Sequence, residues 1–180
     1  MAEKVSSEEK EEILDRVEQR AAAYEYEFHG CGQTILLALQ QEFNLPGGTA
    51  VLKATGFMGG GTALMGDTCG ALVGCMLALG LVSGRERIEE EMYLTEIDER
   101  GRSHLPALAL TRRFYRRFQK EFGGQLCRDI QTRLFGRSFN MADQKEFEEF
   151  QKAGGFVERS KLVGKAARLA AGIILEMPRR

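Results

Sequence analysis

The sequence predicts an all-α protein: a single-domain, multi-helix bundle with glycine-rich connections. Apolar residues recur every three to four positions along most of the chain, which is the period of an amphipathic helix. No segment shows the strict apolar–polar alternation of a half-buried strand. The chain has 21 glycines against 3 prolines, and the glycines cluster between the periodic segments, where they indicate turns.

Length and composition limit the class of protein. The 180 residues fit one domain, taken as residues 1–180 with a core over about 24–176. A hydrophobic content of 43% excludes a disordered chain. The formal net charge of −1 leads us to expect no nucleic-acid partner. The most apolar window, residues 69–82, is shorter than the roughly 20 residues of a membrane span, so we expect no membrane partner.

The first helix is predicted over residues 7–28, where apolar side chains share one face. Ser6 and Glu9 have the spacing of a capping box, in which a hydroxyl and a carboxylate satisfy free backbone N–H groups. This N-terminal helix precedes all four cysteines of the chain.

Further helices follow, mostly separated by glycines. They are predicted over residues 32–43, 49–55, 69–81, 105–122, 125–135, 142–152 and 157–176. The loop at residues 56–61 reads Gly-Phe-Met-Gly-Gly-Gly, which no regular element favours. Charged residues dominate the segment 85–101, interpreted as an insertion that is either a solvated helix or partly ordered.

Small residues recur every four positions before and within the predicted helix 69–81, at Gly66, Gly70, Gly74 and Ala78. This spacing places them on one face and predicts that another helix backbone approaches closely there. Such a strip and the amphipathic helices also suit a helix–helix contact between two copies, so we expect a homodimer.

Three cysteines stand at or near predicted helix starts: Cys31, Cys69 and Cys127. Free backbone N–H groups and the positive end of the helix dipole stabilise a thiolate at such positions. A thiolate binds metal or attacks as a nucleophile, so these residues are candidates for one site. The alternative is three core cysteines. Cys75, amid leucines and valines, is predicted to be a buried core residue.

Two histidines and a glycine loop complete the candidates. His29, two residues before Cys31, is a candidate ligand or base, whereas we expect His104 on the surface. Cys-x-x-Cys-His is absent, so we expect no c-type haem. Residues Gly59, Gly60 and Gly61 are candidates to bind a cofactor through backbone N–H groups. Alternatively, they only allow a tight turn against neighbouring helices.

The arrangement around the cysteines resembles a known family. Residues 69–74 read Cys-Gly-Ala-Leu-Val-Gly, with the glycine loop before them. Gly30 and Cys31 open one predicted helix, and Cys127 follows a Gly-Gly pair. This pattern resembles the C-GCAxxG-C-C family of redox-active proteins over about 24–175. A related helical domain occurs in split-Soret cytochromes c, which are associated with an iron–sulfur centre. The resemblance therefore implies an iron–sulfur cluster or another metal.

The resemblance assigns roles residue by residue. Cys31, Cys69 and Cys127 match the family's first three cysteines. The fourth should precede a Leu-Val-x-x-Ala-Ala run, and here Ser160 stands two residues before Leu162. The implied metal ligands are thus the three cysteines with Ser160; His29 and Cys75 are other candidates for the fourth ligand.

Three functions follow. The first is a redox accessory or electron-transfer protein that holds a metal or iron–sulfur centre and has a redox partner protein. The second is a thiol–disulfide redox protein with Cys69 as catalytic thiolate, Cys31 or Cys127 as resolving thiol, and a thiol pKa well below about 8.5. The third is a non-enzymatic binding module that has lost its redox centre. Four cysteines and an N-terminus without an apolar signal stretch lead us to expect a cytoplasmic location.

Overall fold

The computed structural model describes residues 6–87 and 105–177 and confirms the all-α prediction. The described residues form eight helices: α1 (Ser7–Phe28), α2 (Cys31–Phe43), α3 (Gly48–Ala54), α4 (Gly70–Ser83), α5 (Leu105–Phe122), α6 (Cys127–Phe135), α7 (Gln144–Lys152) and α8 (Gly155–Ile174). Helices α1 and α5 have the predicted bounds, and the others differ by one or two residues at an end. Most of the charged segment 85–101, and His104, lie outside the described residues.

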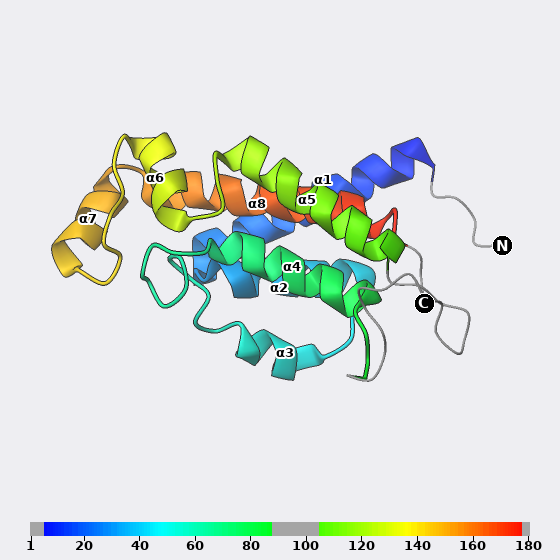
Figure 1. The fold of residues 1–180 in the computed structure, drawn as a ribbon. Coiled ribbons are helices and arrows are strands. Elements are labelled where there is room, and N and C mark those ends of the chain that lie inside the picture. Colours follow the sequence, from blue (N-terminus) through cyan, green and yellow to red (C-terminus); the bar gives the residue numbers. More distant parts are fainter. Residues whose placement is uncertain (1–5, 88–104, 178–180) are drawn as a thin grey trace.

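The two long helices α1 and α8 lie side by side, and α2 and α4 pack against them (Figure 1). Helix α5 contacts both α4 and α8, which closes the bundle. Helices α6 and α7 lie at one end, whereas α3 stands at the periphery next to α2 (Figure 1). In the part of the chain that is described, no helix is both long and apolar enough to cross a membrane.

Helix α1 forms because its sequence combines a cap with one apolar face. The backbone N–H of Glu9 donates to Ser6 Oγ at 3.1 Å, which satisfies a free donor of the first turn. Leu14, Val17 and Ala21 are buried at helical spacing. The same face also buries Glu25, although the helical spacing would place an apolar residue at this position.

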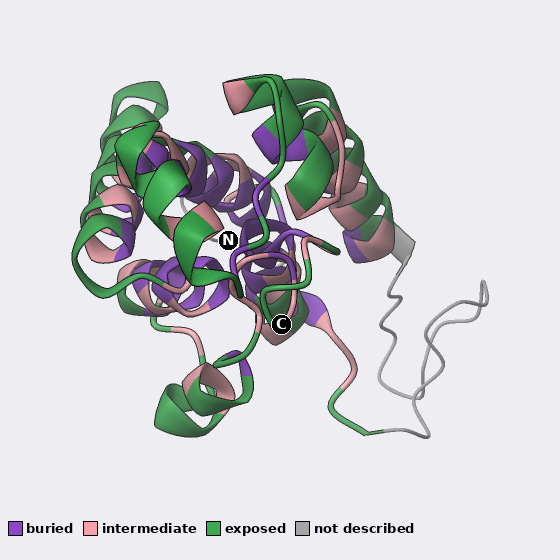
Figure 2. Ribbon diagram, turned by 90° about the vertical axis from the view of Figure 1, so that its left-hand side faces the viewer, coloured by how far each residue is buried: buried purple, intermediate pink, exposed green. Residues whose placement is uncertain are grey.

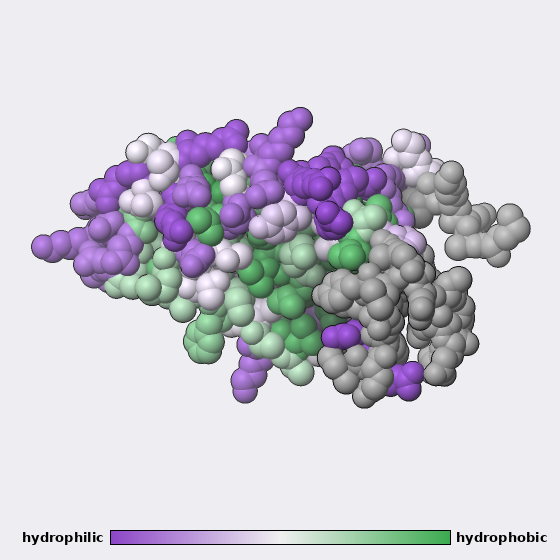
Figure 3. Space-filling model, in the orientation of Figure 1, coloured by the Kyte–Doolittle hydropathy of each residue, from purple (hydrophilic) through white to green (hydrophobic). Residues whose placement is uncertain are grey.

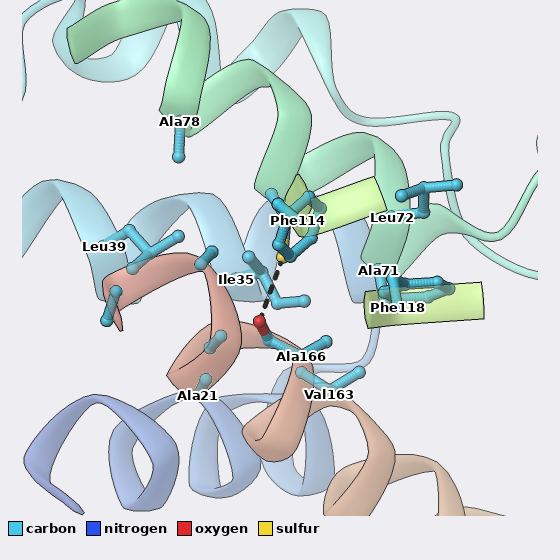
Figure 4. Packing of buried hydrophobic residues seen from close by; sticks show 14 of the residues in the cluster. Ala21, Ile35, Leu39, Ala71, Leu72, Ala78, Phe114, Phe118, Val163 and Ala166 are labelled. Atoms are coloured by element: carbon cyan, nitrogen blue, oxygen red, sulfur yellow. Dashed lines mark hydrogen bonds between the residues drawn. The ribbon is translucent and has the colours of Figure 1, made fainter. Parts of the chain in front are cut away.

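The core lies where the five large helices meet, and buried residues fill the centre of the molecule (Figure 2). Ile35 of α2, Phe114 of α5 and Val163 of α8 are completely buried there (Figure 4). The Cys75 thiol donates to the carbonyl of Ala166 at 3.4 Å, drawn as a dashed line in Figure 4. Cys75 is therefore the buried core cysteine that the sequence predicts.

The small-residue strip brings α4 against α2. A Cβ added at Gly74 would lie 2.6 Å from the carbonyl oxygen of Gly32, and one at Gly70 would collide with the carbonyl of Met58. The predicted approach of a helix backbone is confirmed at Gly74, whereas at Gly70 the backbone that comes close belongs to the glycine loop. Gly66 lies in the loop before α4. The close approach places the N-terminus of α4 beside that of α2, which positions the site described next.

Candidate functional site

The three candidate cysteines lie at helix starts, as predicted. Cys31 and Cys127 are the first residues of α2 and α6, and Cys69 is the N-cap of α4. Cys31 and Cys69 are 7% and 5% exposed, and Cys127 is half-buried. All three thiols are free in the structure.

Backbone hydrogen bonds hold two of these helix starts together. The N–H of Cys69 donates to the carbonyl of Gln125 at 2.8 Å, and the N–H of Cys127 donates to that of Asp67 at 2.7 Å. These bonds form the antiparallel bridge between Thr68 and Leu126. They place Cys69 and Cys127 side by side although α5 separates them in the sequence.

Cys31, the first residue of α2, lies beside the other two cysteines. A Cβ added at Gly70, the residue after Cys69, would lie 3.4 Å from the Cβ of Cys31. The thiolates of Cys31, Cys69 and Cys127 all repel one another electrostatically. We call these three residues the three-cysteine site.

Burial controls the acidity of the thiols. Loss of solvation raises the pKa of Cys31 well above its ordinary value, raises that of Cys69, and raises that of Cys127 to about 12. The backbone N–H groups of Ala71 and Leu72 do favour the Cys69 thiolate, as its place at a helix start predicts. Desolvation outweighs them, so the structure does not provide the pKa below about 8.5 that the thiol–disulfide function requires.

A buried ion pair adjoins the site. Glu25 of α1 is 0% exposed, and its Oε1 lies 2.7 Å from Arg159 Nε of α8. Among the described residues, no acceptor meets the geometry of a hydrogen bond from this Nε–H group. The other carboxylate oxygen accepts from the Thr34 hydroxyl at 2.8 Å, and the Cys31 thiol donates to Oε1 at 3.5 Å.

Sequence analysis missed this pair. The available signal was a glutamate on the apolar face of α1, one turn after Ala21. Nothing comparable identified Arg159, which stands one residue before Ser160 among other charged residues. The guanidinium favours the thiolates of Cys31 and Cys127, which places a positive charge beside two of the three thiols.

His29 is held next to the ion pair. Its Nδ1 lies 2.9 Å from the Glu25 carbonyl and 2.9 Å from Arg159 Nη2. Its ring lies against that of Phe156, with 4.5 Å between the centroids. Its Nδ1 is thus engaged, and His29 lines a pocket together with Cys31.

The glycine loop packs directly on the site. Gly61 has φ +78°, and an added Cβ would lie 2.6 Å from the Cβ of Cys127. A side chain there would displace the cysteine, which supports the interpretation as a tight turn at this position. Gly59 and Gly60 line a pocket beside Cys31.

The predicted fourth ligand is buried but otherwise engaged. The Ser160 hydroxyl donates to the carbonyl of Phe156, one turn earlier in α8, at 2.8 Å. Within residues 6–87 and 105–177, no group of three or more His, Cys, Asp or Glu that could hold a metal ion is found, and this finding includes the three cysteines.

A family model described as "Putative redox-active protein (C_GCAxxG_C_C)" matches residues 29–173. The chain belongs to the C_GCAxxG_C_C family. Searches of curated proteins and of solved structures found no match to the chain. In this C_GCAxxG_C_C protein the matched range includes all three site cysteines and Arg159, whereas Glu25 precedes it. The carboxylate of the buried ion pair therefore comes from α1, outside the matched range.

Proposed function

We propose that this C_GCAxxG_C_C protein is an electron-transfer or redox accessory protein. Its redox centre is an iron–sulfur cluster held by Cys31, Cys69 and Cys127. The observation that carries the proposal is the convergence of two buried thiols and one half-buried thiol from three helix starts. Such a cluster supplies one-electron transfer when it is bound.

The donors around the thiols fit a cluster. The N–H groups of Ala71 and Leu72 favour the Cys69 thiolate, and the Gln131 amide donates to Cys127 Sγ at 3.5 Å. The Arg159 guanidinium is a positive charge that favours the thiolates of Cys31 and Cys127. Hydrogen bonds to sulfur and a nearby positive charge tune the potential of a cluster.

The raised pKa values of the thiols favour coordination of a metal centre over thiol–disulfide exchange. An attacking thiol needs an accessible thiolate near neutral pH, and here burial raises the pKa of all three thiols. A bound metal centre deprotonates the thiols that coordinate it.

The test is purification without oxygen, followed by a visible spectrum and by assays of iron and acid-labile sulfide on one sample. We expect a brown protein that contains both. Separate replacements Cys31→Ser, Cys69→Ser and Cys127→Ser should each lower the iron content. Cys75→Ser is the matched control, because a serine there can still donate to the carbonyl of Ala166.

A colourless, metal-free protein overturns the proposal. Thiol titration before and after mild oxidation then separates the other two functions. Oxidation of two of the three thiols Cys31, Cys69 and Cys127 to a disulfide would indicate a thiol–disulfide protein. Retention of all four thiols would indicate a binding module.

A further inference from the structure

A pocket of about 420 Å³ lies beside Cys31. The start of α2, the glycine loop, the segment around α7 and Arg159 of α8 form it. Its volume falls within the range of small-molecule sites, about 300–1,000 Å³. Cys31 belongs to both the pocket and the three-cysteine site, whereas Cys69 and Cys127 do not line the pocket.

Most of the lining is apolar. It includes the side chains of Phe57, Ala63, Leu64, Met141 and Phe147. Phe57 is 83% exposed and Leu64 43%, so large apolar side chains of this loop remain in contact with water. In Figure 3 apolar residues gather over α4 and toward the preceding loop, whereas the region of α5 is polar. Two aromatic side chains and a methionine suit a flat, apolar ligand.

The polar part of the lining is small. It consists of His29, Gln33 and Arg159, besides the thiol of Cys31. Arg159 is the one charged side chain among the described residues of the lining, and the Glu25 carboxylate 2.7 Å away balances it. An anionic ligand would therefore bring an unbalanced charge into a largely apolar pocket, which is costly. The Gln33 amide donates one N–H to the carbonyl of Leu52 at 3.1 Å and has a second N–H for a ligand, so the lining favours a neutral ligand with an acceptor oxygen.

We propose that this pocket binds a neutral, planar carbonyl compound of the quinone class. A quinone combines a flat apolar ring with two acceptor oxygens, which the aromatic walls and the polar side of the pocket accommodate. The choice of a redox-active carbonyl compound rests on the proposed function, because Cys31 belongs to both the pocket and the redox site. The shape and charge of the pocket favour a neutral, planar ligand independently of the proposed function.

Gly59 offers a way to fill the pocket without disturbing the backbone. A Cβ there would meet only the Cα of Gly30, at 3.8 Å, and the residue needs no positive φ. Gly59→Leu should therefore occupy the pocket. Gly80→Leu is the matched control, because a Cβ at this exposed position of α4 meets nothing within 4 Å.

The probe is 2,3-dimethyl-1,4-naphthoquinone, whose quinone ring has no free position for addition of the Cys31 thiol. Binding is followed without oxygen by methyl NMR of methionine-labelled protein. We expect a saturable shift of the Met141 methyl and none of Met177, which packs against Ser83. Gly59→Leu should weaken binding by about tenfold or more, and Gly80→Leu should not. If Gly59→Leu does not fold, Gly59→Ala should weaken binding in the same direction.

No saturable shift at Met141, or equal binding by Gly59→Leu and the wild type, overturns the proposal. Tighter binding of the anionic probe 2-naphthoate than of the quinone also overturns it. Iron and sulfide are assayed on the same sample, so the two proposals fail separately. A colourless protein that binds the quinone refutes only the cluster, and a brown protein that does not bind it refutes only the pocket ligand.

Discussion

Arg159 Nε lies 2.7 Å from Glu25 Oε1, and this ion pair joins α8 to α1 beside the thiol of Cys31. Glu25 is completely buried and Arg159 is largely so. Removal of either partner leaves the other charge buried without compensation, which is usually more costly than the pair itself is stabilising. The pair therefore links the stability of the bundle to the geometry of the three-cysteine site.

The first prediction concerns this pair. Glu25→Leu and Arg159→Met should each lower the free energy of unfolding by about 3 kcal/mol or more, because each leaves one buried charge. The double variant should be less destabilised than the sum of the two single variants. Urea denaturation of the four proteins measures the coupling. Strictly additive effects would show that the two charges do not stabilise each other.

The second prediction concerns the contact between α4 and α2. Gly74→Ala should destabilise the protein by about 3 kcal/mol, because the methyl group would lie 2.6 Å from the carbonyl oxygen of Gly32. Gly80→Ala, on the exposed side of the same helix, should instead stabilise it by about 1 kcal/mol through helix propensity. Thermal and urea unfolding compare the two variants. Equal effects would mean that helix propensity alone matters at both positions.

The third prediction concerns pH. In the reduced, metal-free protein the pKa of Cys127 is raised to about 12, whereas in the unfolded chain it is about 8.5. The unfolded state therefore loses its proton first as the pH rises, so the stabilising contribution is complete below about pH 8.5 and is lost toward pH 12. Cys127→Ser should show a shallower loss of stability between pH 9 and 11. Parallel curves for the two proteins would contradict the raised pKa.

The fourth prediction tests the position that the family resemblance assigns to the fourth ligand. Ser160→Cys should make the loaded protein bleach several-fold more slowly in the presence of an iron chelator, because a thiolate binds iron better than a hydroxyl does. Ser83→Cys is the control, since it adds a thiol at the far end of α4, beside Met177. Visible absorbance over time measures the loss. Identical rates for Ser160→Cys and the wild type would remove this position from the ligand set.

Local sequence signals predicted most of the fold. The bounds of α1 and α5 follow from a cap, from apolar periodicity and from a terminating glycine pair, all of which act within a few residues. The strip at Gly70 and Gly74 predicted a close helix approach because only glycine lacks a Cβ. Helix starts differ by one or two residues both where glycine is the N-cap, as in α2 and α8, and where another residue is, as in α6 and α7, because helix boundaries are set only to within a residue or two.

The site was predicted only in part. Cys31, Cys69 and Cys127 could be identified because glycines and capping residues mark helix starts locally. The direction of their pKa shift could not be predicted from the sequence, because desolvation depends on how α1, α2, α4 and α8 enclose the thiols. The pair of Glu25 and Arg159 was missed for the same reason: it exists only once the first and last helices pack together.

The reciprocal hydrogen bonds between Cys69 and Gln125 and between Cys127 and Asp67 also bear on the order of folding. During synthesis, the loop before α4 emerges well before the start of α6. Contacts between segments far apart in sequence require closure of a long loop, and this slows their formation. The three thiols consequently assemble late, and Cys31 and Cys69 stay accessible to oxidants and to metal donors until α6 docks. Under the proposed iron–sulfur function, iron therefore has to reach the nascent chain before this pair of bonds forms.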